Sequence, residues 1–249
     1  MSLVAVVGDV ATTTATALTA GWPVTEAVVL LEADPTGGDL AAWFDLATAP
    51  GLVSAVAAAP SGSWLAIREY VQHSNGIDVL VTPGRAGDAE HVVGEAASRI
   101  VPTLARLDDV VTIADCGTQH PLHLSPIAVQ AGLVVLTIYP SVASDRAVAV
   151  QLDRHGELLD TFTRLGIPVV AAVVTGGLYD TAEVAAFLGG ITGPAPVVEI
   201  AHDPTAARMI AGRAAGRAKI ARSPLLRSAT KAALVLSARV RVGMLDGAR

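Results

Sequence analysis

Lysine is nearly absent from this sequence: among its 249 residues it occurs only as Lys219 and Lys231. Arginine does not relieve the shortage at the start of the chain, because the first arginine is Arg68. Chemistry that needs a lysine ammonium group before position 219 is therefore excluded.

Cysteine and charged residues are scarce as well. The single cysteine, Cys116, excludes a disulfide framework and any zinc module built from several cysteines. Charged residues make up 16% of the chain and hydrophobic residues 52%, a balance that excludes a disordered, solvating chain. A chain of this length is able to bury a substantial hydrophobic core.

The few charges are unevenly distributed. Residues 1–204 carry 22 acidic and 7 basic side chains, a net charge of −15. Residues 205–249, here called the basic tail, carry 10 basic side chains and 1 acidic one, a net charge of +9. This asymmetry indicates an acidic partner for the basic tail, either another molecule or the acidic body of the same chain.

Signals for export or membrane insertion are weak. The apolar N-terminus lacks the positively charged flank of a secretory signal, so we expect the protein to reside in the cytoplasm. Residues 116–144 contain no Asp, Glu, Lys or Arg, but histidines and prolines interrupt them. The stretch therefore predicts a loop, a short helix and a buried strand, not a membrane span.

Short apolar runs rich in β-branched residues alternate with segments of helical character. The predicted strands are Leu3–Val7, Ala27–Leu31, Ile77–Thr82, Val110–Ala114, Leu133–Ile138, Val169–Val174 and Val197–Ile200. The predicted helices are Ala11–Ala20, Asp39–Phe44, Ser63–Gln72, Asp88–Leu107, Ser144–Leu165, Thr181–Leu188, Pro204–Arg213 and Pro224–Val240. This alternation predicts one α/β domain over residues 1–249, with a doubly wound, mostly parallel sheet flanked by helices and a helical basic tail.

Polar loops follow several of the predicted strands, at residues 8–14, 32–39, 115–118 and 201–204. Acidic residues stand at three neighbouring strand ends. Because ligands bind at the carboxyl ends of the strands in such a sheet, the set predicts a site for a metal ion and phosphate. Each single carboxylate also has a simpler interpretation, as the cap of the helix that follows it.

These motifs together resemble the ParA/MinD family of deviant-Walker P-loop ATPases, including its CpaE/TadZ branch, which places pilus machinery. Residues 7–14 fall where the family has its Lys-Gly-Gly-x-Gly-Lys-Thr-Thr phosphate loop. Residues 29–40 resemble the second family motif with its Asp-Pro pair, and residues 111–115 resemble the Walker B strand. The resemblance covers almost the whole chain and implies a P-loop NTPase-like fold.

The resemblance also implies a set of functional residues. Those expected at a nucleotide are Gly8, Asp9, Val10, Ala11, Thr12, Thr13 and Thr14 in the loop, and Thr175, Asp203 and Pro204 near the adenine. Those expected at Mg²⁺, if a nucleotide binds, are Thr13, Asp34 and Asp115. In an active enzyme Glu32, Asp34 and Asp115 would carry the catalytic roles.

The departures from the family motif all affect the phosphate site. Thr12 stands at the phosphate-binding lysine, and Val7 stands at the signature lysine that in relatives reaches the partner's nucleotide across the dimer. Asp9 and Ala11 replace two loop glycines. Glu32 replaces the aspartate that helps to position the attacking water.

Loss of the lysine removes the main electrostatic attraction for a phosphate. A unit charge pair at about 4 Å interacts by about 4 kcal/mol at an effective dielectric constant near 20. Asp9 adds a like charge near the expected anion, and Ala11 restricts backbone freedom relative to glycine. The sequence therefore favours a degenerate Walker A motif and a pseudo-ATPase, which binds either ATP or ADP with Mg²⁺ or no nucleotide. The competing interpretation is that an arginine, such as Arg146 or one from a partner, replaces the lysine.

The resemblance implies a positioning or scaffolding protein that forms a homodimer and recruits a larger assembly, such as a pilus, division or segregation apparatus. One alternative is a weak but genuine Mg-ATP-dependent ATPase switch. A second alternative is a module that binds DNA or an anionic membrane surface through Arg213, Arg217, Lys219 and Arg222, uses that have precedent among ParA and MinD relatives.

The basic tail itself favours packing on the body. No aromatic residue follows Phe187, so base stacking and aromatic membrane anchoring lack support. An apolar helical stripe consists of Leu225, Leu226, Ala229, Ala232, Ala233 and Leu236. We expect this stripe to pack on the body, with the arginines in solvent and facing the acidic domain or a partner.

A metal cluster could also be drawn from Asp115, Cys116, His120 and His123. Their spacing is not a recognised zinc spacing, and Pro121 bends the segment between the histidines. We interpret the segment as a loop at the sheet edge, and Cys116 has no basic neighbour that would activate its thiol.

Overall fold

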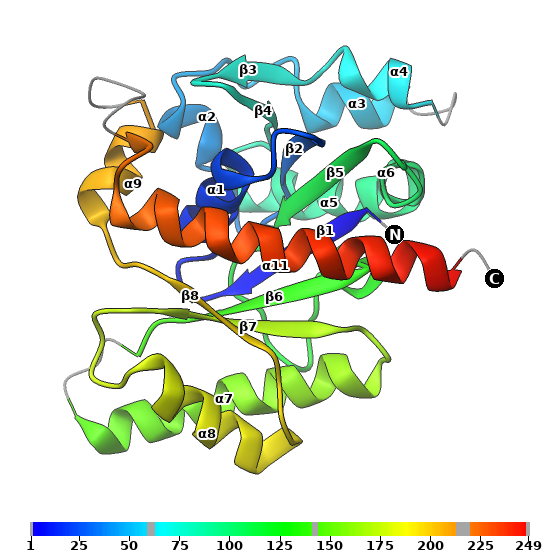
Figure 1. The fold of residues 1–249 in the computed structure, drawn as a ribbon. Coiled ribbons are helices and arrows are strands. Elements are labelled where there is room, and N and C mark those ends of the chain that lie inside the picture. Colours follow the sequence, from blue (N-terminus) through cyan, green and yellow to red (C-terminus); the bar gives the residue numbers. More distant parts are fainter. Residues whose placement is uncertain (1, 59–62, 141–143, 213–219, 248–249) are drawn as a thin grey trace.

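An eight-stranded sheet forms the centre of the molecule (Figure 1). The computed structural model describes residues 2–58, 63–140, 144–212 and 220–247. Its strands are β1 (Leu3–Gly8), β2 (Ala27–Glu32), β3 (Gln72–Ser74), β4 (Ile77–Leu80), β5 (Val110–Asp115), β6 (Leu133–Ile138), β7 (Val169–Val174) and β8 (Val197–Ile200). They lie in the order β3-β4-β2-β5-β1-β6-β7-β8, and all neighbours are parallel except β3 and β4. The predicted doubly wound, mostly parallel sheet is confirmed.

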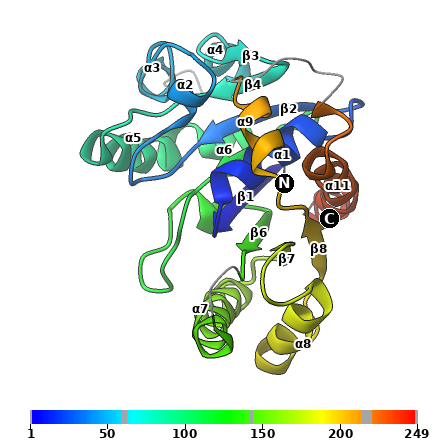
Figure 2. The same cartoon turned by 90° about the vertical axis from the view of Figure 1, so that its left-hand side faces the viewer.

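Helices cover both faces of the sheet (Figure 2). They are α1 (Ala11–Gly21), α2 (Leu40–Trp43), α3 (Leu52–Ala58), α4 (Trp64–Arg68), α5 (Ala86–Arg99), α6 (Val101–Leu104), η2 (Ala128–Gln130), α7 (Asp145–Arg164), α8 (Thr181–Thr192), α9 (Pro204–Ile210) and α11 (Pro224–Gly247). The core on one face includes side chains from α1, α2, α9 and α11, and the core on the other includes side chains from α3, α5, α6, α7 and α8.

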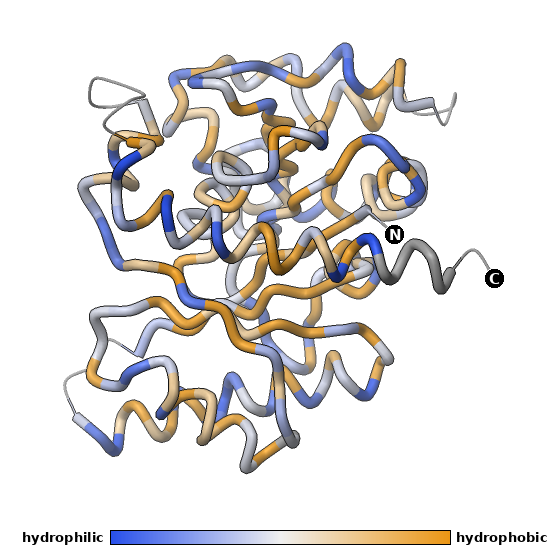
Figure 3. The backbone as a smooth tube through the Cα atoms, viewed as in Figure 1, coloured by the Kyte–Doolittle hydropathy of each residue, from blue (hydrophilic) through white to orange (hydrophobic). Residues whose placement is uncertain are grey.

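The central strands are apolar on both sides, as Figure 3 shows by the orange colour of the sheet. In β1 the side chains of Leu3, Ala5 and Val7 enter the core beneath α5 and α7, whereas Val4 and Val6 enter the core beneath α1 and α11. Both sets are fully buried because successive side chains of a strand point to opposite faces. The near-continuous apolar runs in the sequence therefore reflect burial on two faces.

One predicted helix is wrong in its second half. The segment expected as a helix over residues 63–72 is helical only over α4, and Gln72 begins the edge strand β3, which the sequence analysis missed. β3 pairs with β4 through a tight turn at Asn75 and Gly76, whose φ angles are 52° and 81°. An Asn-Gly pair with two positive φ angles is typical of a two-residue hairpin, so tertiary pairing with β4 replaced the helix.

A second predicted helix, residues 88–107, is divided. Helix α5 ends at Arg99, and the short helix α6 follows with Pro102 in its first turn. Proline lacks a backbone N–H and its ring clashes with the preceding turn, so a continuous helix cannot pass this position undisturbed. Helix α3 (Leu52–Ala58) was also not predicted.

Within the uncharged stretch, residues 116–140 form a loop, the short helix η2 and the buried strand β6, as predicted, and residues 141–143 lie outside the described residues. In the part of the chain that the structure describes, none of the helices combines the length and apolarity needed to cross a membrane.

Helix α11 packs along the body, as expected for the basic tail. Leu225, Ala229 and Leu236 are among its buried residues, and Arg241 forms an ion pair with Glu26, with 2.6 Å between Nε and Oε1. Gly21 allows this packing, since a Cβ there would lie 2.9 Å from a backbone nitrogen of α11. Of the basic residues considered for DNA or membrane contact, Arg222 is exposed, and Arg213, Arg217 and Lys219 lie outside the described residues.

Candidate functional site

The loop that resembles a phosphate loop lies at the centre of the sheet's carboxyl edge. It joins β1 to α1, and β1 is flanked by β5 on one side and β6 on the other. Glu32 at the end of β2 is the register partner of Asp115 at the end of β5, which in turn lies beside β1. The acidic residues predicted at three neighbouring strand ends are therefore brought together by the fold.

The backbone of the loop has a tight, defined course. Gly8 has a φ angle of 107°, and a Cβ there would lie 2.4 Å from the carbonyl oxygen of Thr137 in β6. The Asp9 backbone N–H donates to that same carbonyl at 3.0 Å. Val10 has a left-handed conformation (φ 48°, ψ 34°), which is strained for a β-branched residue, and α1 begins directly after it.

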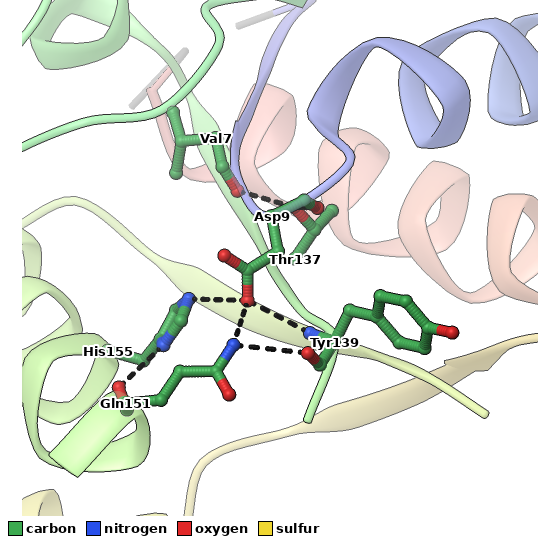
Figure 4. Close-up of polar contacts among 6 residues, drawn as sticks. All are labelled: Val7, Asp9, Thr137, Tyr139, Gln151 and His155. Atoms are coloured by element: carbon green, nitrogen blue, oxygen red, sulfur yellow. Dashed lines mark hydrogen bonds and ion pairs between the residues drawn. The ribbon is translucent and has the colours of Figure 1, made fainter. Parts of the chain in front are cut away.

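Asp9 turns its carboxylate toward α7 (Figure 4). Its Oδ2 atom accepts hydrogen bonds from the backbone nitrogen of Tyr139 at 3.1 Å and from Nε2 of Gln151 at 2.8 Å. Nε2 of His155 lies 3.2 Å from the same oxygen, and the His155 side chain is only 10% exposed. Three groups from β6 and α7 thus hold the carboxylate that the sequence places at a loop glycine.

The charge of Asp9 is compensated within this network. Nδ1 of His155 lies 2.8 Å from the backbone oxygen of Gln151, so both ring nitrogens of His155 lie within hydrogen-bond distance of an oxygen atom. Burial raises the pKa of the Asp9 carboxyl, but the hydrogen bonds and charge supplied by His155, with those from Tyr139 and Gln151, leave the pKa below its ordinary value.

The two positions at which the family motif has lysine differ in their surroundings. Val7 is 0% exposed and belongs to the core beneath α5 and α7. Thr12 is half-buried in the first turn of α1, close enough to Asp115 for its side chain to lower the pKa of that carboxyl. A lysine at position 7 would bury an ammonium group among apolar side chains, whereas one at position 12 would face a carboxylate.

A second group of carboxylates lies on the other side of β1. The pKa of Asp115 is raised to about 6, chiefly by burial and in addition by the negative charges of Asp34 and Asp39, while interactions with Thr12 and Gly117 lower it. Among the described residues, no ion pair reaches Asp34, Asp39 or Asp115. This acidic cluster is therefore short of positive charge, in contrast to Asp9.

Glu32 uses both carboxylate oxygens to hold the backbone. Oε1 accepts the N–H of Leu40 at 2.6 Å and Oε2 accepts the N–H of Thr82 at 2.7 Å, which joins β2 to the start of α2 and the end of β4. Burial raises the pKa of Glu32 to about 7, with a further contribution from the charge of Asp115. A Cβ on Gly38 would lie 2.4 Å from Oε2, so the glycine makes room for this contact.

The residues expected at Mg²⁺ lie near one another only in part. Oδ1 of Asp34 accepts the N–H and the hydroxyl of Thr36 at 2.8 and 2.7 Å, and a Cβ on Gly117 would lie 2.0 Å from Asp34 Oδ2. Asp34 thus lies against the segment that follows β5, while Thr13 is half-buried on α1. Within the described residues, no group of three or more His, Cys, Asp or Glu side chains is arranged to hold a metal ion.

The segments expected near adenine meet at the ends of β7 and β8. The Thr175 N–H donates to the Ile200 carbonyl at 2.8 Å, and Asp203 caps α9 by accepting the N–H of Ala206 at 2.9 Å. The rings of Tyr139 and His202 stack, with centroids 4.7 Å apart. Asp203 therefore has the capping role that was the simpler interpretation, with Pro204 as the first residue of the helix.

Cys116 and the histidines after it form a loop, as interpreted from the sequence. Burial strongly raises the pKa of the Cys116 thiol, which keeps it protonated and unreactive. His120 and His123 lie opposite each other in a short bridge, with ring centroids 6.1 Å apart.

Sequence reasoning missed the residues that hold the loop from the other side. Thr137, Tyr139, Gln151 and His155 all contact the loop through Asp9, yet they lie some 130 residues further along the chain. No local motif marks them. The only available signal was that the helix after β6 must pack beside β1, which a sequence pattern alone does not specify at the level of single side chains.

Similarity to proteins of known structure supports the fold. No model of a known protein family matches the chain, and no curated protein matches it. A ParA family ATPase from Chlorobium tepidum TLS superposes with a TM-score of 0.69 at 16% identity, over 94% of this chain and 98% of that one. MinD from Pyrococcus horikoshii OT3 in complex with Mg-ADP gives 0.65 at 16% identity, over 93% of each chain. The MinC:MinD cell division protein complex of Aquifex aeolicus gives 0.62 at 14% identity, over 96% of each chain.

These similarities show that the chain has the fold of ParA and MinD ATPases. Its loop residues do not fit the nucleotide that such a fold can hold. The backbone part of a phosphate site is present, since the loop precedes a helix N-terminus. The cationic part is not, because the uncharged Thr12 stands at the lysine position close to Asp115, whose pKa is already raised by burial and by neighbouring carboxylates. A phosphate chain would add negative charge where protein charges already repel one another.

Proposed function

We propose that this protein is a positioning or scaffolding protein of the ParA/MinD type, close to the CpaE/TadZ branch, with a degenerate nucleotide site. It acts by forming a homodimer and recruiting a larger assembly such as a pilus, division or segregation apparatus. The observation that carries the proposal is that the two lysine positions of the family motif hold Val7, which is buried in the core, and the uncharged Thr12, which lies close to the buried carboxyl of Asp115.

The remaining contacts of the loop support the same proposal. Val7, at the position of the signature lysine, is buried in the core, and Asp9 is bound to β6 and α7. The loop thus has hydrogen-bond partners within the chain itself. Because Val7 at the position of the signature lysine cannot contact a partner's nucleotide with a charge, we expect the dimer to be independent of nucleotide.

The solved structures provide the context for recruitment. The Pyrococcus horikoshii MinD was solved with Mg-ADP and the Aquifex aeolicus MinD was solved with MinC. We transfer the second property, association with a partner protein, to this chain and propose that the first is lost or weak.

A coupled-enzyme ATPase assay tests the loss of hydrolysis. We expect turnover below about one per minute for the natural protein, because an uncompensated phosphoryl transfer loses several kcal/mol of transition-state stabilisation. Thr12→Lys should increase ATP affinity, whereas Ala20→Lys, an exposed site at the other end of α1, should not. Faster turnover in the natural protein, abolished by Asp34→Ala, would contradict the proposal.

Light scattering with and without Mg-ATP tests the dimer. A dimer of the same mass in both conditions supports a scaffold that does not switch. Dimerisation that strictly requires ATP would instead assign a nucleotide switch to this protein.

A weak but genuine Mg-ATPase is the second candidate, favoured by two observations at the loop. The backbone retains a left-handed residue directly before α1, and the buried hydroxyl of Thr14 has no hydrogen-bond partner among the described residues. Thermal unfolding with Mg-ATP separates the two candidates, because a ligand that binds only the native state at about 100 times its Kd stabilises it by about 2.7 kcal/mol. No shift in melting temperature excludes the ATPase.

A further inference from the structure

Strand β8 is the last strand of the sheet and exposes one edge of its backbone. The N–H of Ala171 in β7 donates to the carbonyl of Pro196 at 3.0 Å, and the N–H of Thr175 donates to the carbonyl of Ile200 at 2.8 Å. Backbone groups alternate in direction along a strand, so Val197 and Glu199 direct their N–H and C=O groups away from β7. Within the described residues, no hydrogen bond reaches these outward groups of Val197 and Glu199.

Helix α11 lies along this edge without covering it (Figure 2). The next outward group, the N–H of Ala201, is satisfied by Oγ of Ser228 on α11 at 2.8 Å. This contact positions the helix beside the strand and leaves a groove of 710 Å³ between them. The groove therefore has an unpaired strand edge as its floor and α11 as one wall.

The wall of the groove is basic. Arg227 and Lys231 on α11 line it, both are exposed, and in the described part of the chain neither forms an ion pair. Glu199 also lines the groove, but its Oε2 atom accepts a hydrogen bond from Thr181 on α8 at 3.2 Å. The half-exposed side chain of Val235 provides an apolar contact further along the wall.

We propose that the groove between β8 and α11 binds an extended, acidic segment of a partner protein, which adds to the edge of β8 as a further strand. The outward backbone groups of Val197 and Glu199 supply the main-chain hydrogen bonds, and Arg227 and Lys231 select for acidic side chains. The inference deepens the recruitment role proposed above and rests on it for its biological use. It names the surface and the chemistry of the partner.

A duplex nucleic acid is the other class of ligand that basic side chains attract, and the geometry favours a peptide. The basic surface is small, since it consists of two cations beside one short strand edge. An unpaired row of N–H and C=O groups is complementary to a polypeptide backbone and not to phosphates. The four-residue length of β8 limits the added strand to a few hydrogen bonds, so the affinity should be moderate.

The test uses the full chain and a dye-labelled octapeptide of alternating valine and glutamate, followed by fluorescence anisotropy. We expect saturable binding with a Kd of about 100 µM or tighter. The double variant Arg227→Glu/Lys231→Glu should weaken binding by about 10-fold or more, because both cations then repel the peptide. The matched control Arg239→Glu reverses an exposed charge on the same helix outside the groove and should change binding less than about 2-fold.

Two further probes make the outcome specific for strand addition. An octapeptide of the same sequence with N-methyl groups on alternate residues loses backbone donors and should bind at least about 10-fold more weakly. No saturable binding at about 1 mM peptide, or equal binding of the N-methylated probe, overturns the proposal. The proposal is also overturned if a DNA duplex competes with the peptide, binds in a salt-dependent manner, and loses as much affinity from Arg239→Glu as from Arg227→Glu/Lys231→Glu. That result would assign the surface to nucleic acid.

These results are independent of the ATPase and light-scattering tests. A nucleotide-independent dimer that fails to bind the peptide refutes this groove while leaving the scaffolding role intact. A protein that binds the peptide but hydrolyses ATP refutes the pseudo-ATPase while leaving the groove intact.

Discussion

The two sides of the loop between β1 and α1 hold carboxylates in opposite electrostatic states. On the β6 side, Asp9 contacts His155, Gln151 and Tyr139, and its pKa is lowered. On the β5 side, Asp115 is buried close to other carboxylates, and its pKa is raised to about 6. The two sides differ because only Asp9 is contacted by side chains from a distant helix, namely Gln151 and His155 of α7.

This difference separates a carboxylate with several polar partners from a group of carboxylates that lie close to one another. On the side that faces α7, the hydrogen bonds of Asp9 form a network that holds the loop in place. The side that would hold a metal ion and phosphate keeps its carboxylates but has no lysine, so its charges remain uncompensated by any ion pair among the described residues. The site therefore has a carboxylate with several hydrogen-bond partners on the side of α7 and, on the side of β5, carboxylates without ion pairs within the described residues.

The largest effect is expected on breaking the β6 side. Asp9→Ala leaves the donors of Tyr139, Gln151 and His155 without their acceptor and should lower the free energy of unfolding by about 3 kcal/mol. Urea denaturation at about pH 7 measures this change. The matched control is Asp153→Ala, an exposed carboxylate on α7, which should change stability by less than about 0.5 kcal/mol. Equal effects of the two variants would show that the network is not stabilising.

The natural protein should lose stability as pH rises from about 4.5 to about 7.5. The raised pKa values of Glu32, about 7, and Asp115, about 6, mean that the native state binds these protons more tightly than the unfolded chain does. The contribution to the free energy of unfolding is complete below the ordinary carboxyl pKa and is lost as pH passes the folded values.

Asp9 contributes with the opposite sign in a different range. Its lowered pKa gives stability that is present above the ordinary aspartate value and is lost as pH falls through the folded value. Urea denaturation as a function of pH should therefore show a maximum near about pH 4 to 5. A free energy of unfolding that is constant or increases between about pH 5 and 7.5 would refute the assignment of raised pKa values to the β5 side.

A smaller gain is expected on neutralising the β5 side. Asp115→Asn keeps an acceptor for the Gly117 N–H but removes the buried charge, and should raise the free energy of unfolding at about pH 7.5 by about 1 to 2 kcal/mol. The gain should vanish only as pH falls below the ordinary aspartate pKa of 3.8, where both the native and the unfolded states hold the proton. Asp39→Asn, an exposed neighbour, should give less than half of the gain. A destabilised Asp115→Asn protein at both ends of this pH range would show that the carboxylate is stabilising.

The smallest effect concerns the residue between the two sides. Val10→Gly removes a β-branched side chain from a left-handed conformation and should stabilise the protein by about 0.5 to 1 kcal/mol, after the added entropy of the unfolded chain. Val24→Gly, at a fully exposed site with no positive φ angle, should have the opposite sign. A loss of stability on Val10→Gly would show that the valine side chain makes contacts that outweigh its backbone strain.

Most of the fold could be predicted from the sequence because the residue patterns that specify its strands lie within short segments. Seven of the eight strands are short apolar runs, and three of them, β6, β7 and β8, have the predicted bounds. The eighth, β3, has only three residues of polar character, and its pairing depends on the Asn75-Gly76 turn and on the edge of β4. Local composition favoured a helix there, and tertiary pairing decided otherwise.

The sequence predicted where the site lies but not the contacts that its side chains make. The strand ends placed Glu32, Asp34 and Asp115 at one edge, but the partners of Glu32 are backbone groups of two separate segments. The partners of Asp9 come from β6 and α7. Such contacts depend on the packing of helices against the sheet, which no short motif encodes.

The scarcity of lysine is a property of the sequence alone, and it already excludes a lysine from the loop in every possible structure. The tertiary structure decided the surroundings of the two positions: Val7 joins the core, and Thr12 is half-buried at the start of α1 near Asp115. The physical reason is that composition limits which charges exist, whereas pairing and burial of each charge depend on which distant elements the fold brings beside it.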